Sequence, residues 1–375
     1  MDPATHALSG ALLNRVAAPR ELAPPRFTLA ERTGLGAVAA LWPDIDWFLG
    51  LLIEDPLVYL NLHRGETHSL ILLPLWALLL GWLSARLWWR GPRDWRDGAL
   101  IFALGIGIHI VGDWITNFGT QLFAPFSRET FSFPSTFIVD PWITGFLILG
   151  LLMCCFRGGR LWAGVGLGGA TAIVVLQGSL MLHAQEYARA EAEQRGLYGA
   201  RVHAMAQPLS PFHWRLFIEG DAYQLSAHLG LFSSRSEVDP DAGIWQRHWQ
   251  MFQPPDDLVW EAFPRFGEGP SQAWGHKAWH RPEMAEFRQF AELPYLRKWV
   301  RHEGDPCAVF ADLRFRIAQV PPPFQYAICR SDTGEWRREA VDYWDILIEE
   351  IDPPLLRGPS ARDRSAWPTA PGQPG

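Results

Sequence analysis

The sequence predicts a mainly α-helical protein: a polytopic helical membrane domain followed by a C-terminal mixed α/β extramembrane domain. Three observations predict this fold class. Residues 34–182 are strongly apolar, whereas residues 183–375 are mixed and polar. The apolar part holds several runs near the roughly 20 residues that a membrane-crossing helix needs. The chain also has 20 Trp and 22 Phe, and Trp is favoured at membrane interfaces because its ring is apolar while its N–H stays hydrated.

This composition divides the chain into three parts. We predict a helical membrane domain with a His/Asp metal site over residues 1–185, and an extramembrane mixed α+β domain over residues 186–356. Residues 357–375 are rich in Pro, Gly and Ser, which predicts a disordered tail. The net charge of −7 offers no basic surface for nucleic acid.

The start of the chain lacks the basic region and apolar stretch of a cleavable signal peptide. It predicts instead a short helix from Pro3, with Asp2 as its N-cap. The next apolar stretch, residues 34–53, carries Asp44 and Asp46 behind Pro43. Carboxylates are costly beside lipid, so we interpret this stretch as a re-entrant or broken segment.

Four further stretches have the length and composition of membrane-crossing helices. They are residues 70–89, 99–118, 137–156 and 161–182. Arginines follow the first and third of them, while the loop 119–136 between the second and third holds only Arg128. The arginines in question are Arg86, Arg90, Arg93, Arg96, Arg157 and Arg160. The positive-inside rule then makes those two loops cytoplasmic and puts the C-terminal domain outside, in the periplasm of a Gram-negative cell.

The C-terminal half changes pattern. Residues 183–196 read as a polar helix, and residues 211–230 and 307–320 alternate in β fashion. Cys307 and Cys329 flank a predicted hairpin. They either pair as a disulfide, if this domain lies outside the cytosol, or remain two buried free thiols.

Eight His and Asp residues of the N-terminal half are candidate metal ligands: His6, Asp44, Asp46, His63, His68, His109, Asp113 and Asp140. His109 and Asp113 are four residues apart in an apolar run, so they share one helix face. An ionised Asp in a span costs about 2.5–3.5 kcal/mol unless it is partnered or hydrated. The pair therefore indicates a polar interior site, or else a structural hydrogen bond that locks two helices.

The arginine-based orientation uses none of these residues, yet it places His63, His68, Asp113 and Asp140 toward the outer face. His109 lies about ten residues into its span, roughly 15 Å deep, whereas His68 lies at the rim. Either the helices are staggered, or the broken segment lines a wet cavity that reaches inward.

Imidazole and carboxylate are the ligands of Zn²⁺, Mn²⁺ and Fe²⁺, and we favour zinc. The candidates outnumber the ligands of one tetrahedral ion, which predicts two ions or one ion with further carboxylates orienting the imidazoles. Glu66 is a candidate general base, or a solvated loop residue. Arg64 is a candidate for holding an anionic substrate group, or a membrane-interface anchor.

Five motifs together resemble the YdjM-type predicted inner-membrane metal-dependent hydrolases. They are THALSGALLNR, LGAVAALWPDID, HRGETHSL, HIVGDWITNFGTQLFAPFS and VDPWITG. The resemblance covers about residues 1–185 and implies a membrane-embedded helical domain, metal-dependent hydrolysis, and the same eight polar positions. It leaves residues 190–375 largely uncovered. We interpret four scattered histidines beyond residue 182 as structural or surface residues: His183, His203, His213 and His228.

These observations favour a multi-pass inner-membrane hydrolase that cleaves an ester or phosphoester of a lipid-like substrate. Its partners would be membrane lipids and a lipid-linked substrate, and its oligomeric state stays open. An ion- or proton-coupled transporter is the first alternative, although it predicts an internal repeat that the sequence does not show. The second alternative is a non-catalytic envelope protein with a structural metal, which closed coordination would favour.

Overall fold

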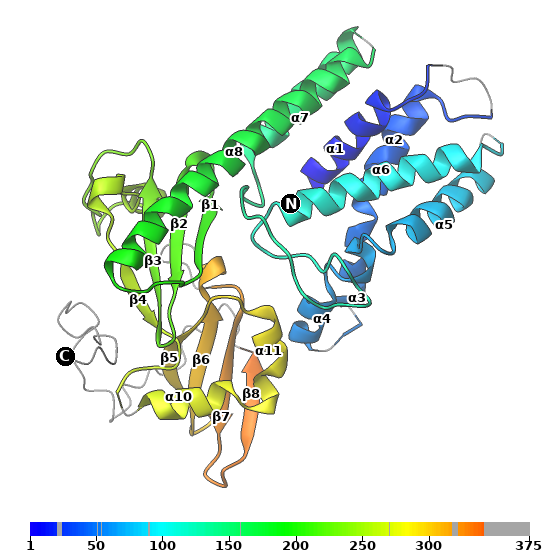
Figure 1. The fold of residues 1–375 in the computed structure, drawn as a ribbon. Helices are drawn as coiled ribbons and strands as arrows, with labels where there is room; N and C mark the ends of the chain where they lie inside the picture. The colour runs from blue at the N-terminus through cyan, green and yellow to red at the C-terminus, as the bar shows by residue number, and fades with distance from the viewer. Residues whose placement is uncertain are drawn as a thin grey trace. The chain divides into compact units, whose positions relative to one another are not determined.

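A computed structural model describes residues 1–20, 25–50, 52–53, 55–88, 91–157, 159–269, 271–316 and 322–340. The chain divides into two compact units (Figure 1). The first comprises Met1–Leu182 and Met205–Phe212, and the second comprises His183–Ala204 and the chain from His213 onward. The predicted tail, residues 357–375, and Arg90 lie outside the described residues.

The first unit is helical. Its helices are α1 (Pro3–Val16), α2 (Leu29–Leu41), α3 (Trp47–Gly50), α4 (Pro56–Leu62), α5 (Leu73–Arg86), α6 (Trp95–Trp114), α7 (Pro141–Arg157) and the first part of α8 (Leu161–Gln194), with short 3-10 turns η1 (Pro43–Asp46) and η2 (Glu66–His68). The predicted start of α1 is confirmed, because the Asp2 carboxylate accepts a hydrogen bond from the Thr5 N–H at 3.1 Å. Thr28 and Glu31 form a capping box at the start of α2.

Small residues let these helices pack closely. A Cβ on Gly98 of α6 would lie 2.5 Å from the Gly81 oxygen of α5, and one on Gly105 would lie 2.5 Å from Ala39 Cβ of α2. Such small-residue contacts are typical of helices that pack within membranes. The approach at Gly105 brings the end of α2 alongside α6, one turn before His109.

Two helices, α6 and α8, are long and apolar enough to cross a membrane. A third candidate arises if Pro56–His68 and α5 count as one span, although they are bent by 72°. Residues 99–118 and 161–182 match full-length candidates, whereas the spans expected over residues 70–89 and 137–156 correspond to shorter apolar helices among the described residues. Residues 70–89 yield only the 14-residue α5, and residues 137–156 yield α7, which begins at Pro141 rather than at residue 137.

The interpretation of residues 34–53 as a broken segment is confirmed. Helix α2 ends at Leu41, η1 follows from Pro43, and α3 covers four residues from Trp47. Proline lacks an N–H and disfavours helical geometry in the residue before it, which explains the break at this point.

The second unit contains two four-stranded antiparallel sheets with sequential strand order. Their strands are β1 (Val202–Gln207), β2 (Ser210–Glu219), β3 (Tyr223–Gly230) and β4 (Glu261–Pro264) in one sheet, and β5 (Pro294–His302), β6 (Asp305–Asp312), β7 (Gln325–Arg330) and β8 (Trp336–Ala340) in the other. The residues around the β1–β2 turn group with the first unit. Short helices α9 (Ile244–Gln250), α10 (Ser271–Trp279) and α11 (Ala285–Phe290) complete the described elements.

The β alternation of residues 211–230 is confirmed by β2 and β3. Within residues 307–320, β6 ends at Asp312 and a 3-10 turn follows over Leu313–Phe315; residues 317–320 lie outside the described part. Cys307 and Cys329 are register partners on β6 and β7 and are joined by a disulfide. Of the two alternatives for these cysteines, the structure has the disulfide.

Candidate metal centre

Helix α6 supplies the first two residues of the site. His109 and Asp113 lie one turn apart on the same face, as their spacing predicts, and both are buried. His109 Nε2 lies 3.4 Å from Asp113 Oδ2. The neighbouring Gly112 leaves room for a further ring, because a Cβ there would lie 3.0 Å from His6 Cε1.

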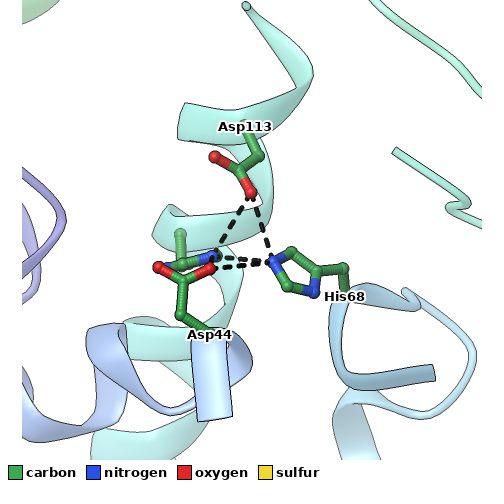
Figure 2. Close-up of side chains that lie close together, drawn as sticks. Asp44, His68 and Asp113 are labelled. Atoms are coloured by element: carbon green, nitrogen blue, oxygen red, sulfur yellow. Dashed lines mark hydrogen bonds and ion pairs between the residues drawn. The ribbon is translucent and has the colours of Figure 1, made fainter. Parts of the chain in front are cut away.

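Two 3-10 turns bring the other members of a four-residue group. Asp44 comes from η1, immediately after α2, and His68 comes from η2, immediately before the chain turns into α5. With His109 and Asp113 they form a group whose ligand atoms lie close enough to hold one metal ion. Figure 2 shows Asp44, His68 and Asp113 pointing toward one another. Asp44 of the broken segment therefore lies beside His109 of α6.

The spacing of the four ligand atoms is that of a tetrahedral site. His68 Nε2 and His109 Nε2 are 3.0 Å apart, and each lies 3.5 Å from Asp44 Oδ1. Asp113 Oδ2 lies 3.2 Å from His68 Nε2 and 3.4 Å from His109 Nε2. A tetrahedral ion with bonds of about 2.0–2.1 Å separates its ligand atoms by about 3.3 Å. Five of the six edges of such a tetrahedron are thus present.

Hydrogen bonds fix which nitrogen of each imidazole faces the centre. His109 Nδ1 donates to the Ala40 carbonyl at 2.6 Å, so the Nε2 of the neutral ring is a bare acceptor. The Thr67 hydroxyl donates to Asp46 Oδ2 at 3.0 Å, and its oxygen accepts from His68 Nδ1 at 3.0 Å. His68 Nε2 is then bare as well. Two imidazole nitrogens and two carboxylate oxygens converge here, and this is a ligand set that suits a divalent ion.

His6 and Arg64 lie around Asp113 rather than in the four-residue group. His6 Nε2 lies 3.1 Å from Asp113 Oδ1, and the His6 ring stacks on His109 with centroids 3.7 Å apart. The Met1 nitrogen contacts the same Asp113 oxygen. Arg64 Nε lies 3.0 Å from Asp113 Oδ2. The contacts orient and neutralise the Asp113 carboxylate.

A second group consists of Asp44, Asp46 and His63. His63 Nδ1 bonds Asp46 Oδ1 at 2.9 Å, and the Arg64 N–H donates to Asp46 Oδ2 at 3.2 Å. Arg64 has a φ of 62°, a left-handed conformation that is unfavourable for a non-glycine residue and that recurs at functional sites. Burial raises the pKa of Asp46, but the hydrogen bond and charge of His63 outweigh it and hold this pKa below its usual range. Asp44 belongs to both groups.

Asp140 does not join either group among the described residues. Its Oδ1 accepts from the N–H groups of Trp142 and Ile143 at 2.9 and 3.0 Å, and its Oδ2 accepts from Gln177 Nε2 at 2.7 Å. Asp140 therefore caps the start of α7 and ties it to α8. An Asp before Pro at a helix start accounts for this role.

The two residues considered for catalysis have different surroundings. Glu66 pairs with Arg128 at 2.6 Å, and both side chains are about 40% exposed; the structure gives Glu66 no contact with the metal groups. Arg64 is buried, and its Nη1 donates to Thr116 Oγ1 at 3.2 Å. Its guanidinium also lies over the Phe118 ring.

Sequence reasoning missed Thr67 and Ala40. Thr67 carries a signal that could have been used, since a hydroxyl beside a candidate His often orients the ring. The Ala40 carbonyl has no such signal, because its position follows from the close packing of α2 on α6.

Comparisons with known proteins match this helical half. The model of the family described as YdjM inner membrane protein matches residues 1–184, which contain both ligand groups. The Bacillus subtilis (strain 168) protein named "Uncharacterized protein YfhP" is 28% identical over 145 residues. That match takes in 38% of this chain and 43% of the relative, so the chain spans less than half of the relative's length. No solved structure matches the chain.

Proposed function

Since residues 1–184 match the model of the YdjM inner membrane protein family, we propose that the chain is a membrane-bound metal-dependent hydrolase. Its proposed substrate is a lipid-like molecule, in which the enzyme would cleave an ester or phosphoester bond. The assignment of a metal ion rests on one observation, the convergence of four side chains at tetrahedral spacing: Asp44, His68, His109 and Asp113. Zinc is the ion we assign, because a His/Asp set without cysteine suits Zn²⁺; Mn²⁺ and Fe²⁺ accept the same ligands.

The two ligand groups have different chemistry. Four protein ligands fill a tetrahedral ion, which is typical of a closed structural site. The group of Asp44, Asp46 and His63 offers three ligands and leaves a position for water or substrate, which is typical of a catalytic site. Asp44 belongs to both groups and would contribute to both, and we assign the three-ligand group as the catalytic one.

Asp44, Asp46 and His63 would hold a divalent ion, which would supply Lewis acidity for the activation of water. Neighbouring residues orient the ligands of this group. Asp46 fixes the His63 ring through Nδ1, which leaves Nε2 available, and it is itself held by Thr67 and the Arg64 N–H. The buried guanidinium of Arg64 places a positive charge beside Asp113. We assign it to attract an anionic head group such as a phosphoester.

Two features support an inner-membrane location with the site and the second unit on the periplasmic side. The arginine-rich loops predict this orientation. The disulfide between Cys307 and Cys329 supports it independently, because disulfides persist in oxidising compartments and are rare in the cytosol. A site in an apolar helical unit also suits a substrate with hydrocarbon chains.

A structural metal in a non-catalytic envelope protein is the second candidate, and the closed four-ligand group favours it. Assays of generic phosphodiester and ester substrates separate the two. The protein is purified in detergent, loaded with Zn²⁺ or Mn²⁺, and compared with a His63→Ala variant. We expect the wild type to hydrolyse a substrate and the variant to lose at least 100-fold in rate while keeping an ion in the four-residue group. Folded, metal-loaded wild type that leaves every substrate intact would favour the structural role.

A further inference from the structure

A cavity of about 180 Å³ lies between α1, α6, α7 and α8 of the first unit. Its walls are mainly apolar, and they include Ile108, Val111, Ile143, Leu147, Leu167 and Val174. An apolar cavity of about 150 Å³ stays dry and is large enough to bind benzene. The cavity is therefore suited to a segment of hydrocarbon rather than to water or a charged group.

One end of the cavity lies against the metal centre. Met1 and His6 line it, and His6 also lies 3.1 Å from Asp113 Oδ1 and stacks on His109. The thickness of one imidazole ring therefore separates the cavity from the four-residue group. A molecule in the cavity would contact the His6 ring, which in turn contacts Asp113 and His109.

The other end opens on the outer surface of the helices. Val111 of α6 is 53% exposed, and Thr171 of α8 is exposed; both line the cavity. These are the two helices that are long and apolar enough to cross a membrane. In a bilayer the opening would face lipid, so a hydrocarbon chain could enter without crossing water.

We propose that this cavity binds one hydrocarbon chain of the substrate, so that the substrate is an amphiphile held by its chain beside the metal centre. This inference rests on the proposed function. It adds the site that selects the substrate, and it excludes small water-soluble esters as the preferred class.

Filling the cavity tests the proposal. Ala170 of α8 is buried and lines the cavity, whereas Ala172, two residues along the same helix, is exposed. Ala170→Leu adds three carbons inside the cavity, and Ala172→Leu adds the same atoms outside it. Thr171→Trp, at the exposed mouth, is a second blocking variant for the case in which Ala170→Leu does not fold. Metal content and thermal unfolding establish that each variant is intact.

The first measurement does not depend on catalysis. The purified protein is labelled with a photoreactive diazirine fatty acid, and the crosslinked peptides are identified by mass spectrometry. We expect labels on the cavity-lining parts of α6, α7 and α8, reduced about tenfold in Ala170→Leu or Thr171→Trp and unchanged in Ala172→Leu. Equal labelling of blocked and wild-type protein would overturn the proposal.

The second measurement compares kcat/KM for a long-chain and a short-chain substrate with the same head group. We expect the ratio to fall about tenfold in the blocked variants, while the short-chain rate is unchanged. If labelling is blocked but this ratio is not, the cavity holds a structural lipid and the substrate assignment is wrong. If labelling behaves as expected and neither substrate is cleaved by the wild type, the proposed function fails while the chain-binding cavity remains.

Discussion

His68 and His109 present their Nε2 atoms to each other at 3.0 Å, although 41 residues separate them in the chain. Thr67 holds the other nitrogen of one ring, and the Ala40 carbonyl holds that of the other. Because both Nδ1 atoms donate, two acceptors face each other beside two carboxylates. This relationship, more than the number of polar residues, supports a metal site.

Thr67→Val removes the hydroxyl that joins Asp46 to His68 while keeping the shape of the side chain. Loss of such an orienting contact typically lowers metal affinity by about 10–100-fold. Competition with a chelator measures the affinity. Thr333→Val, in the exposed turn between β7 and β8 of the second unit, is the control and should bind metal like the wild type. Unchanged metal affinity in the Thr67→Val protein would show that the Thr67 hydroxyl does not orient the metal-binding residues.

Gly105→Ala separates α2 from α6. The added Cβ would lie 2.5 Å from Ala39 Cβ, so we expect a loss of about 1–3 kcal/mol in the free energy of unfolding. The shift also moves the Ala40 carbonyl away from His109, so metal affinity should fall as well. Gly107→Ala is a matched control on the same helix, since its Cβ would come no closer than 3.8 Å to Leu73. Equal behaviour of the two variants would contradict this explanation.

Acid should destabilise the second unit. Burial lowers the pKa of His213 to about 4, with the charge of His248 adding to the effect, and burial likewise lowers the pKa values of His228 and His248. The unfolded chain then binds protons more readily, so stability is full above about pH 6.5 and falls as the pH drops toward 4.

Chemical unfolding of the full chain in detergent, followed by Trp fluorescence between pH 7.5 and 4.5, measures this loss. His213→Phe keeps the stacking on Phe252, whose ring centroid lies 4.2 Å away, and removes the titrating group. We expect a shallower pH dependence in the variant. Identical slopes would show that His213 does not control the acid response.

The disulfide allows a test of compartment. The chain has four cysteines, of which Cys154 and Cys155 are free. Alkylation of thiols in intact cells, followed by mass spectrometry, should modify at most these two and leave Cys307 and Cys329 paired. Reduction should cost the second unit about 2–4 kcal/mol in unfolding free energy. Four alkylated cysteines in cells would contradict the periplasmic assignment.

Part of this architecture follows from the sequence. The i, i+4 spacing of His109 and Asp113 predicts their shared face, and Pro43 predicts the break after α2, because both depend on local geometry. The alternation of residues 211–230 likewise predicts strands. The number of full-length spans does not follow from hydropathy, because the cap at Asp140 starts α7 late and the chain bends before α5.

The composition of the site is harder to predict. Asp140 resembles the ligands in type and in expected position, but it belongs to neither ligand group and instead accepts hydrogen bonds from the backbone of α7 and from Gln177. The sharing of Asp44 by two groups depends on how η1 and η2 approach α6. Only tertiary packing sets that approach, so no spacing rule in the sequence reveals it.

Elemental analysis of purified protein tests the central claim most directly. We expect two zinc, manganese or iron ions per chain in the wild type, about one in His63→Ala, and loss of the ion of the four-residue group in His109→Ala. His183→Ala, outside both groups, should retain both ions. Wild-type protein that is folded yet contains no metal after loading would contradict the account, because the converging nitrogens and carboxylates would then not form a metal site.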